Sequence, residues 1–225
     1  MHKGLFIVFE GIDGSGTTTQ CQVLTEKLAT LGHPVAQTRE PGGTPLAEAI
    51  RALVLDPKST GIADLTELLL YAASRAQHVS EKIRPALMQG AHVICDRFTA
   101  STWAYQGYGR GLDLALIAQV TKIAEDGCEP DLTVYLQVPL ALARTRRAKR
   151  GQVPDRLELA GDDFQARVAN GYQELAKLNP DKAMAVDGSR NPNEVATEIW
   201  NGLRERWPEF PSPTPKAPTK NQGTR

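Results

Sequence analysis

The chain has 225 residues, of which 41% are hydrophobic and 23% charged, and its 26 basic and 26 acidic side chains give no net charge at pH 7. This length favours one sizeable globular domain over two, and the balanced charge argues against a protein that binds nucleic acid regardless of sequence. No apolar stretch is long enough to span a bilayer, and the N-terminus lacks the apolar region and cleavage site of a signal peptide.

The three cysteines, Cys21, Cys95 and Cys128, are odd in number, widely spaced and in no metal-ligand pattern. This usage predicts free, buried thiols in a reducing cytoplasm.

Short β-rich segments alternate along the chain with longer helical patterns. Strands are predicted at Leu5–Glu10, Pro34–Glu40, His92–Arg97, Leu132–Val138 and Ala183–Asp187. Helices are predicted near 16–31, 64–90, 112–127, 162–178 and 192–206, and Pro85 is expected to kink or interrupt the second of them. The alternation predicts an α/β, three-layer fold with a five-stranded parallel sheet covered by helices. We expect one domain over residues 1–207 and a disordered, proline-rich tail over 208–225.

A glycine-rich turn follows the first predicted strand, and a helical pattern begins at once. It reads Gly11-Ile12-Asp13-Gly14-Ser15-Gly16-Thr17-Thr18. This strand–turn–helix context is typical of a P-loop, in which backbone N–H groups and the helix N-terminus bind phosphate, and it predicts an ATP site at these eight residues. Thr18 occupies the position whose hydroxyl binds Mg²⁺. The general pattern has lysine at position 17, so the turn alone is also compatible with a simple tight connection.

Charged residues end the second and third predicted strands. Arg39 ends one, and Asp96 with Arg97 ends the other. Open α/β sheets place ligands at this edge, so Asp96 is expected near Mg²⁺, with Arg97 and Arg39 clamping a phosphate through forked donors. The alternative is a set of structural ion pairs.

Six motifs occur in the order and spacing of bacterial thymidylate kinases, and the similarity runs from about residue 4 to about residue 206. The motifs are Gly11–Gly16, Arg39–Thr44, Leu70–Arg75, Asp96–Phe98, Ala104–Gly111 and Pro130–Leu136. The chain therefore resembles this family of P-loop nucleoside monophosphate kinases.

The resemblance implies roles for individual side chains. Tyr71 matches the aromatic that stacks on the thymine ring, Arg75 matches a donor to a base carbonyl, and Thr102 and Gln106 match polar residues of the base pocket. Arg97 and Arg39 match ligands of the acceptor phosphate, Asp13 the carboxylate facing the 3′-hydroxyl, and Tyr105 the ring that crowds a ribose 2′-hydroxyl. The alternative is that Tyr71 is core and Arg75 a solvated charge. Four residues apart, however, the two lie on one helix face and can converge on one ligand.

A basic run follows the fourth predicted strand. It consists of Arg144, Arg146, Arg147, Lys149 and Arg150, and Asp155-Arg156-Leu157-Glu158 comes shortly after. Alone, such a run is typical of a solvated helix face. The resemblance places a mobile lid here, at about 146–160. It matches Arg146, Arg150 and Arg156 to lid arginines that act in catalysis alongside Asp13, Arg39, Asp96 and Arg97. Relatives with a basic residue beside the P-loop acid can dispense with lid arginines, but this chain has Gly14 there.

These observations predict Mg²⁺-dependent phosphoryl transfer from ATP to thymidine 5′-monophosphate in dTTP biosynthesis. The resemblance also implies a homodimer. We expect Arg146, Arg150 or Arg156 to compensate for the lysine that Thr17 replaces. One rival is a kinase for another acceptor such as deoxyuridylate, and a second is a nucleotide-binding protein without catalysis, suggested by Thr17. A GTPase is disfavoured because the sequence has no Asn-Lys-x-Asp signature.

Overall fold

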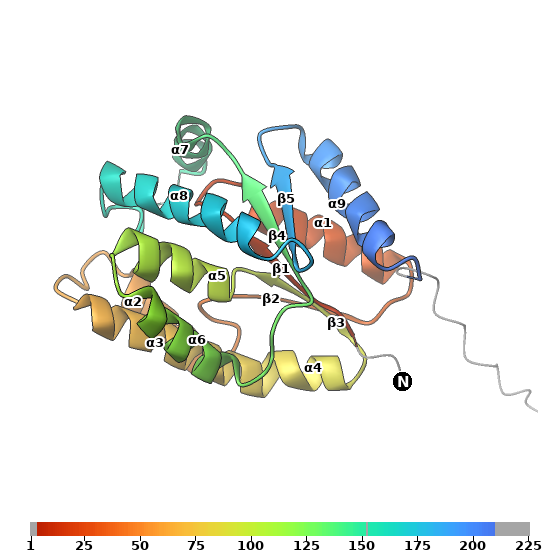
Figure 1. Cartoon of the computed structure of the whole chain (residues 1–225), viewed down its shortest axis with the longest axis horizontal. Helices are drawn as coiled ribbons and strands as arrows, with labels where there is room; N and C mark the ends of the chain where they lie inside the picture. The colour runs from red at the N-terminus through yellow and green to blue at the C-terminus, as the bar shows by residue number, and fades with distance from the viewer. Residues whose placement is uncertain (1–3, 152, 210–225) are drawn as a thin grey trace, which may run out of the picture.

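The computed structural model describes residues 4–151 and 153–209 and contains a five-stranded sheet between helices (Figure 1). The strands, all parallel, are β1 (Phe6–Glu10), β2 (Val35–Arg39), β3 (His92–Asp96), β4 (Leu132–Gln137) and β5 (Ala183–Asp187), in the order β2-β3-β1-β4-β5. The predicted α/β fold with a five-stranded parallel sheet is confirmed, and each strand lies within one residue of its predicted bounds at either end. Disorder is predicted for the tail over 208–225, and residues 210–225 lie outside the part of the chain that the structure describes.

The helical elements connect these strands. They are α1 (Thr17–Thr30), α2 (Pro45–Leu55), α3 (Asp64–His78), η1 (Val79–Ile83), α4 (Arg84–Met88), α5 (Thr99–Thr102), η2 (Trp103–Gly109), α6 (Leu114–Glu125), α7 (Leu140–Lys149), α8 (Asp162–Leu178) and α9 (Pro192–Arg206). None of the helices within the described ranges is long and apolar enough to cross a membrane.

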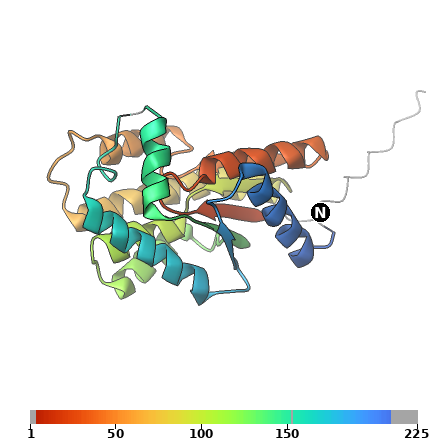
Figure 2. The ribbon, with the colours of Figure 1, turned by 90° about the horizontal axis from the view of Figure 1, so that it is seen from above.

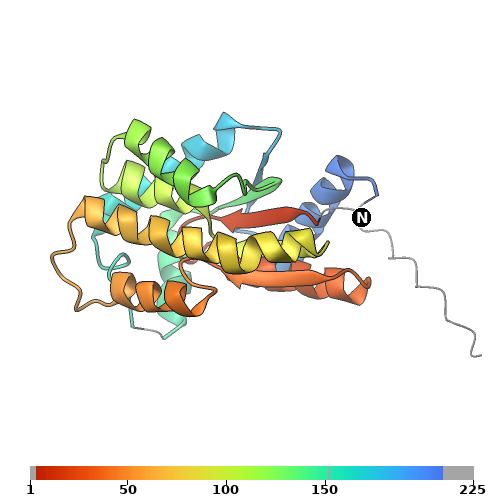
Figure 3. The ribbon, with the colours of Figure 1, turned by 90° about the horizontal axis from the view of Figure 1, so that it is seen from below.

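The alternating side chains of β1 divide the core into two layers. Ile7 and Phe9 pack in the cluster that α1 and α9 cover, the face seen in Figure 2. Phe6 and Val8 pack in the opposite cluster, which η1 and α4 cover and which Figure 3 shows from below. All four side chains are almost completely buried, as expected for a central parallel strand with helices on both faces.

The long helical segment over 64–88 changes its hydrogen-bond pattern in the middle. It runs as one continuous coil past the sheet in Figure 3, but η1 is a π-helical turn between α3 and α4. Pro85 lies in the first turn of α4, where its missing N–H costs no helical hydrogen bond. The predicted interruption at Pro85 is therefore confirmed.

Three helical regions were not predicted from the sequence. They are α2, the α5–η2 segment and α7. The start of α2 has a recognisable sequence signal, because the Thr44 hydroxyl accepts from the Ala47 N–H and Pro45 occupies the first turn. Most of the basic run lies on α7, which is compatible with the alternative of a charged helix face.

The strand register brings the charged strand ends together. Asp96 pairs with Arg39 of β2 on one side and with Phe9 of β1 on the other. The residues that end β1, β2 and β3 therefore share the carboxyl edge of the sheet, where the glycine-rich turn also begins.

Candidate active site

The glycine-rich turn has the backbone of a phosphate-binding loop. Gly14 and Gly16 have φ values of 92° and 102°, which side-chain-bearing residues rarely adopt. Gly16 precedes α1 and provides no side-chain cap. The first N–H groups of α1 are therefore left to bind an anion.

Position 17 is the first residue of α1, and Thr17 is buried there. Its side chain lines the main cavity of the site but brings no charge to it. The backbone carbonyl of Ala143 on α7 lies against the same loop, because a Cβ added to Gly14 would meet it at 2.5 Å. Close packing of α7 thus leaves no room for a basic side chain at position 14.

Thr18 and Asp96 form the expected pair for a divalent cation. The Thr18 hydroxyl donates to Asp96 Oδ2 at 2.5 Å, and Asp96 Oδ1 is buried without a hydrogen-bond partner among the described residues. A hydroxyl and a carboxylate with a free oxygen are hard oxygen ligands of the kind that Mg²⁺ prefers. The two residues therefore fit the group that the sequence pattern implies.

Arg97 connects the strand edge to the glycine-rich turn. It has φ 72°, an unusual value for a residue other than glycine, and its guanidinium donates to Asp13 Oδ1 at 2.7 Å and to the Tyr172 hydroxyl at 2.8 Å. Asp13 Oδ2 also accepts from the Tyr105 hydroxyl at 2.8 Å. Such a backbone conformation persists only where its surroundings determine it, and here they turn Arg97 toward the loop.

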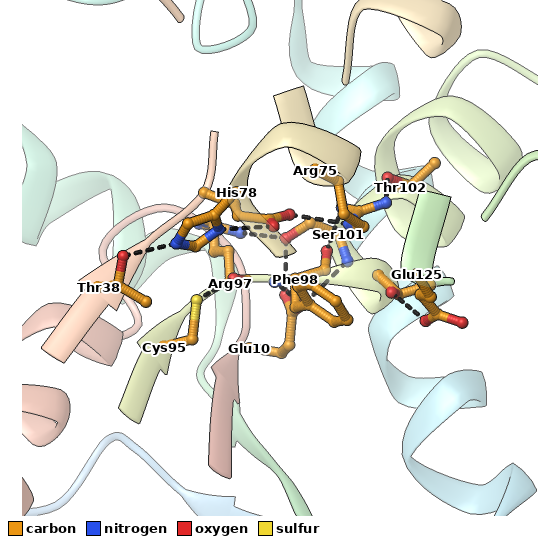
Figure 4. A network of polar contacts seen from close by, with 12 residues as sticks. Glu10, Thr38, Arg75, His78, Cys95, Arg97, Phe98, Ser101, Thr102 and Glu125 are labelled. Carbon is orange, nitrogen blue, oxygen red and sulfur yellow. Dashed lines mark hydrogen bonds and ion pairs between the residues drawn. The ribbon is translucent and has the colours of Figure 1, made fainter. Parts of the chain in front are cut away.

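Glu10, at the end of β1, supports this arrangement from below (Figure 4). One carboxylate oxygen accepts from the Phe98 and Ser101 N–H groups, and the other accepts from the Ser101 and Tyr172 hydroxyls. Burial raises the pKa of Glu10, partly offset by the nearby Arg97 charge. The carboxylate fixes the turn after β3, and sequence reasoning missed it.

Arg75 lies at the centre of a buried network (Figure 4). Its guanidinium donates to Glu40 Oε2 at 2.8 Å, to the Thr102 hydroxyl at 3.0 Å and to the Phe98 carbonyl at 2.9 Å. The alternative that Arg75 is a solvated charge is wrong, because only 2% of its surface is exposed. Glu40 Oε1 in turn contacts His78 Nδ1 at 2.9 Å, so its whole carboxylate serves to orient other side chains.

A cavity of about 380 Å³ unites most of the predicted residues. Its lining includes Asp13, Gly14, Thr17, Thr18, Arg39, Tyr71, Arg75, Asp96, Arg97, Thr102, Tyr105, Gln106 and Arg150. Of the predicted P-loop residues, Gly11, Ile12, Ser15 and Gly16 are not in this lining. The phosphate-binding loop and the predicted base pocket thus open into one space.

The three candidate lid arginines have different positions. Arg150 lines the cavity. Arg146 donates to the Gly188 carbonyl at 2.8 Å and to that of Ser189 at 3.2 Å, next to the donor side of the loop. Arg156 forms an ion pair with buried Glu67 at 2.6 Å and donates to the Val54 carbonyl at 2.8 Å. Neither Arg146 nor Arg156 lies in the cavity lining.

A model of the thymidylate kinase family matches residues 9–199. The thymidylate kinase of Deinococcus radiodurans is 48% identical over 206 residues, which cover 92% of this chain and 99% of that protein. The chain belongs to the thymidylate kinase family. The thymidylate kinase of Pelotomaculum thermopropionicum is 46% identical and covers 90% of this chain and 94% of its own. A crystal structure of thymidylate kinase from Ehrlichia chaffeensis superposes with a TM-score of 0.74 at 37% identity, covering 90% of this chain and all of that one.

In this member of the thymidylate kinase family, the sequence pattern identified the side chains that face the cavity. It missed the side chains that hold them in position. Glu40 accepts from Arg75, Tyr172 from Arg97 and Glu67 from Gln106. Glu10 and His78 act one step further back, where they contact Tyr172 and Glu40. One signal was available, because a glutamate that ends the apolar strand β1 is costly unless it has partners. The partners themselves come from distant segments and have no local pattern.

Proposed function

We propose that the chain transfers the γ-phosphoryl group of ATP to thymidine 5′-monophosphate, giving ADP and thymidine 5′-diphosphate for dTTP biosynthesis. The observation that carries this proposal is the contact between Asp13 and Arg97 at 2.7 Å. It joins the phosphate-binding loop to the acceptor side of the cavity, so two nucleotides can meet with their phosphates adjacent.

On the donor side, ATP phosphates bind the N–H groups of the loop and of the start of α1. Thr18 and Asp96 hold Mg²⁺, which neutralises charge on the phosphates when it is bound. Support for this site comes from the 2.5 Å contact between the two side chains and from the free Oδ1 atom of Asp96.

On the acceptor side, Arg97 and Arg39 bind the 5′-phosphate. Arg39 forms an ion pair with Glu48 at 2.9 Å and is about half exposed, so it is free to exchange partners. Tyr71 stacks on the base, Arg75 donates to a base carbonyl, and Thr102 and Gln106 complete the pocket. Asp13 faces the 3′-hydroxyl, and the Tyr105 ring crowds a 2′-hydroxyl.

The reaction needs positioning and charge neutralisation more than it needs a base, because the acceptor phosphate already carries its nucleophilic oxygen. Thr17 leaves the loop without its usual lysine charge. We assign the compensating charge to Arg150, because it alone of the three candidate lid arginines lines the cavity. Arg146 and Arg156 are bound to backbone carbonyls and to Glu67.

We further propose a cytoplasmic homodimer. Support for the location comes from three cysteines that are all buried and free. Support for the dimer comes from exposed leucines on the adjacent helices α2 and α3: Leu46, Leu53, Leu65 and Leu69, each about half exposed. Another face of α3 carries Tyr71 and Arg75.

A coupled assay for ADP release with ATP, Mg²⁺ and a panel of nucleoside monophosphates tests the function. We expect turnover with thymidine monophosphate, lower activity with deoxyuridine monophosphate and little with purine or cytidine nucleotides. The thymine methyl group is worth only about 1–3 kcal/mol, so the first two differ by about 10–200-fold at most. ATP binding without phosphoryl transfer to any nucleotide would select the non-catalytic alternative.

A further inference from the structure

Glu67 is a fully buried carboxylate on α3, one turn before Tyr71. Its Oε1 atom accepts from Gln106 Nε2 at 2.8 Å and from Arg110 Nε at 3.2 Å. Its Oε2 atom accepts from Arg110 at 3.0 Å and lies 2.6 Å from the Arg156 guanidinium. Three donor side chains from two separate segments, η2 with its C-cap residue and the loop of Arg156, therefore meet on one carboxylate behind the base pocket.

This carboxylate is ionised in the folded protein. Burial alone would raise the pKa of Glu67, but the hydrogen bonds from Arg110, Gln106 and Arg156 and the charge of Arg110 together outweigh burial and lower it. An ionised carboxylate accepts hydrogen bonds and cannot donate one. Whatever faces Glu67 must therefore be a donor.

Gln106 is thereby fixed in one of its two amide orientations. Its NH₂ group must point to Glu67, so its carbonyl oxygen is the end that remains for the cavity that Gln106 lines. Arg75, held by Glu40, presents only donors to the same cavity. The pocket thus offers an acceptor from Gln106 and a donor from Arg75.

Pyrimidine bases differ in the pattern that this pair of groups recognises. Thymine and uracil carry a hydrogen on N3 and a carbonyl at C4, whereas cytosine has an acceptor at N3 and an amino group at C4. A carbonyl oxygen facing N3 therefore accepts a hydrogen bond from thymine or uracil. With cytosine, the same oxygen faces the N3 lone pair and no hydrogen bond forms. A site built to hydrogen-bond one pattern discriminates strongly against its inverse, because buried polar groups are left unpaired.

We propose that Glu67 is a specificity-determining positioning residue, which fixes the Gln106 amide with its carbonyl toward the base and so admits pyrimidine nucleotides with an N3 hydrogen while rejecting cytidine nucleotides. The proposal rests on the proposed function of the cavity. It adds that the choice of base is set by a side chain that never touches the nucleotide.

The test is Glu67→Gln, measured as kcat/KM for thymidine and deoxycytidine monophosphates. A glutamine at this position both donates and accepts, so Gln106 can turn its NH₂ group toward the base. We expect the ratio of the two kcat/KM values to fall by about 10–100-fold, through a higher KM for the thymidine nucleotide and a gain with the deoxycytidine nucleotide. An equal fall for both nucleotides, with the ratio unchanged, would overturn the proposal.

Asp64→Asn is the matched control. Asp64 lies 3.5 Å from the Arg110 guanidinium, about half exposed, and its hydrogen-bond and ion-pair contacts do not include Gln106. The substitution removes a carboxylate from Arg110, the arginine that Glu67 also contacts. We expect the ratio of the two kcat/KM values to stay at its wild-type value. Glu67→Asp is the second variant if Glu67→Gln does not fold, because it keeps the charge but withdraws it from Gln106 by one methylene.

Binding calorimetry separates this inference from the proposed function. Dissociation constants of the two monophosphates for wild type and for Glu67→Gln report base selection without any turnover. If the wild-type protein binds the thymidine nucleotide selectively but transfers no phosphoryl group, the proposed function fails and the role of Glu67 stands. If the binding preference is the same in both proteins, the role of Glu67 fails.

Discussion

At the scale of single residues, position 17 bears directly on the proposed phosphoryl transfer. A threonine there can fill space and donate one hydrogen bond, but it brings no positive charge. Of the described arginines in the cavity lining, Arg97 and Arg39 are paired with Asp13 and Glu48, Arg75 is bound to Glu40, and Arg51 donates to the Pro41 carbonyl. Arg150, at the end of α7, lines the cavity together with Thr17.

We expect Arg150→Ala to lower kcat by about 100–1,000-fold, the usual cost of losing a group that stabilises transition-state charge. Thr17→Lys should restore part of the lost kcat in the Arg150→Ala background and should change the kcat of the wild type less. The reason is that the introduced lysine and Arg150 would stabilise the same transition-state charge. The measurement is kcat in all four proteins, with Lys149→Ala as the control from the same basic run. An unchanged kcat in Arg150→Ala would refute the assignment.

At the scale of elements, a histidine links the start of β3 to the residue before β1. His92 Nδ1 accepts from the Leu5 N–H at 3.0 Å, and the ring lies 5.4 Å from that of His33. Burial, aided by the His33 charge, lowers the pKa of His92 from 6.5 to about 4. Protonation would also remove the acceptor that Leu5 needs.

This predicts a stability that depends on pH. The unfolded chain takes up a proton on His92 below pH 6.5, whereas the folded chain resists it until about pH 4. The free energy of unfolding should therefore fall as the pH drops through this window. We expect the urea midpoint of His92→Asn, whose amide oxygen can replace Nδ1, to fall less steeply than that of the wild type. Parallel curves for the two proteins would contradict the prediction.

The elements also differ in how well the sequence predicts them. All five strands are short β-rich runs and the long helices have helical patterns, and Pro85 marks the irregular turn between α3 and α4. The α5–η2 segment was not predicted, because it contains Gly107 and Gly109 and depends on contacts with α8 and Glu10. The left-handed backbone of Arg97 is set by distant partners in the same way. Local propensity cannot encode these arrangements.

At the scale of the whole molecule, α3 connects the base pocket to the surface. Glu67, Tyr71 and Arg75 follow one another at intervals of four and face the cavity or the residues behind it. Leu65 and Leu69 lie one turn apart on another face and are each about half exposed. A second copy packed on this face would bury them and fix the helix that binds the base.

We therefore expect Leu69→Glu to shift the protein from a dimer, with twice the chain mass of 24.5 kDa, toward a monomer, because a charge buried in an apolar interface is costly. Light scattering after size exclusion measures this mass. Leu178→Glu, at an exposed leucine on α8, is the control and should keep the wild-type mass. Because Tyr71 and Arg75 belong to the same helix, the monomer should show a higher KM for the acceptor nucleotide at low protein concentration. A wild-type protein that is monomeric at every concentration would exclude this interface.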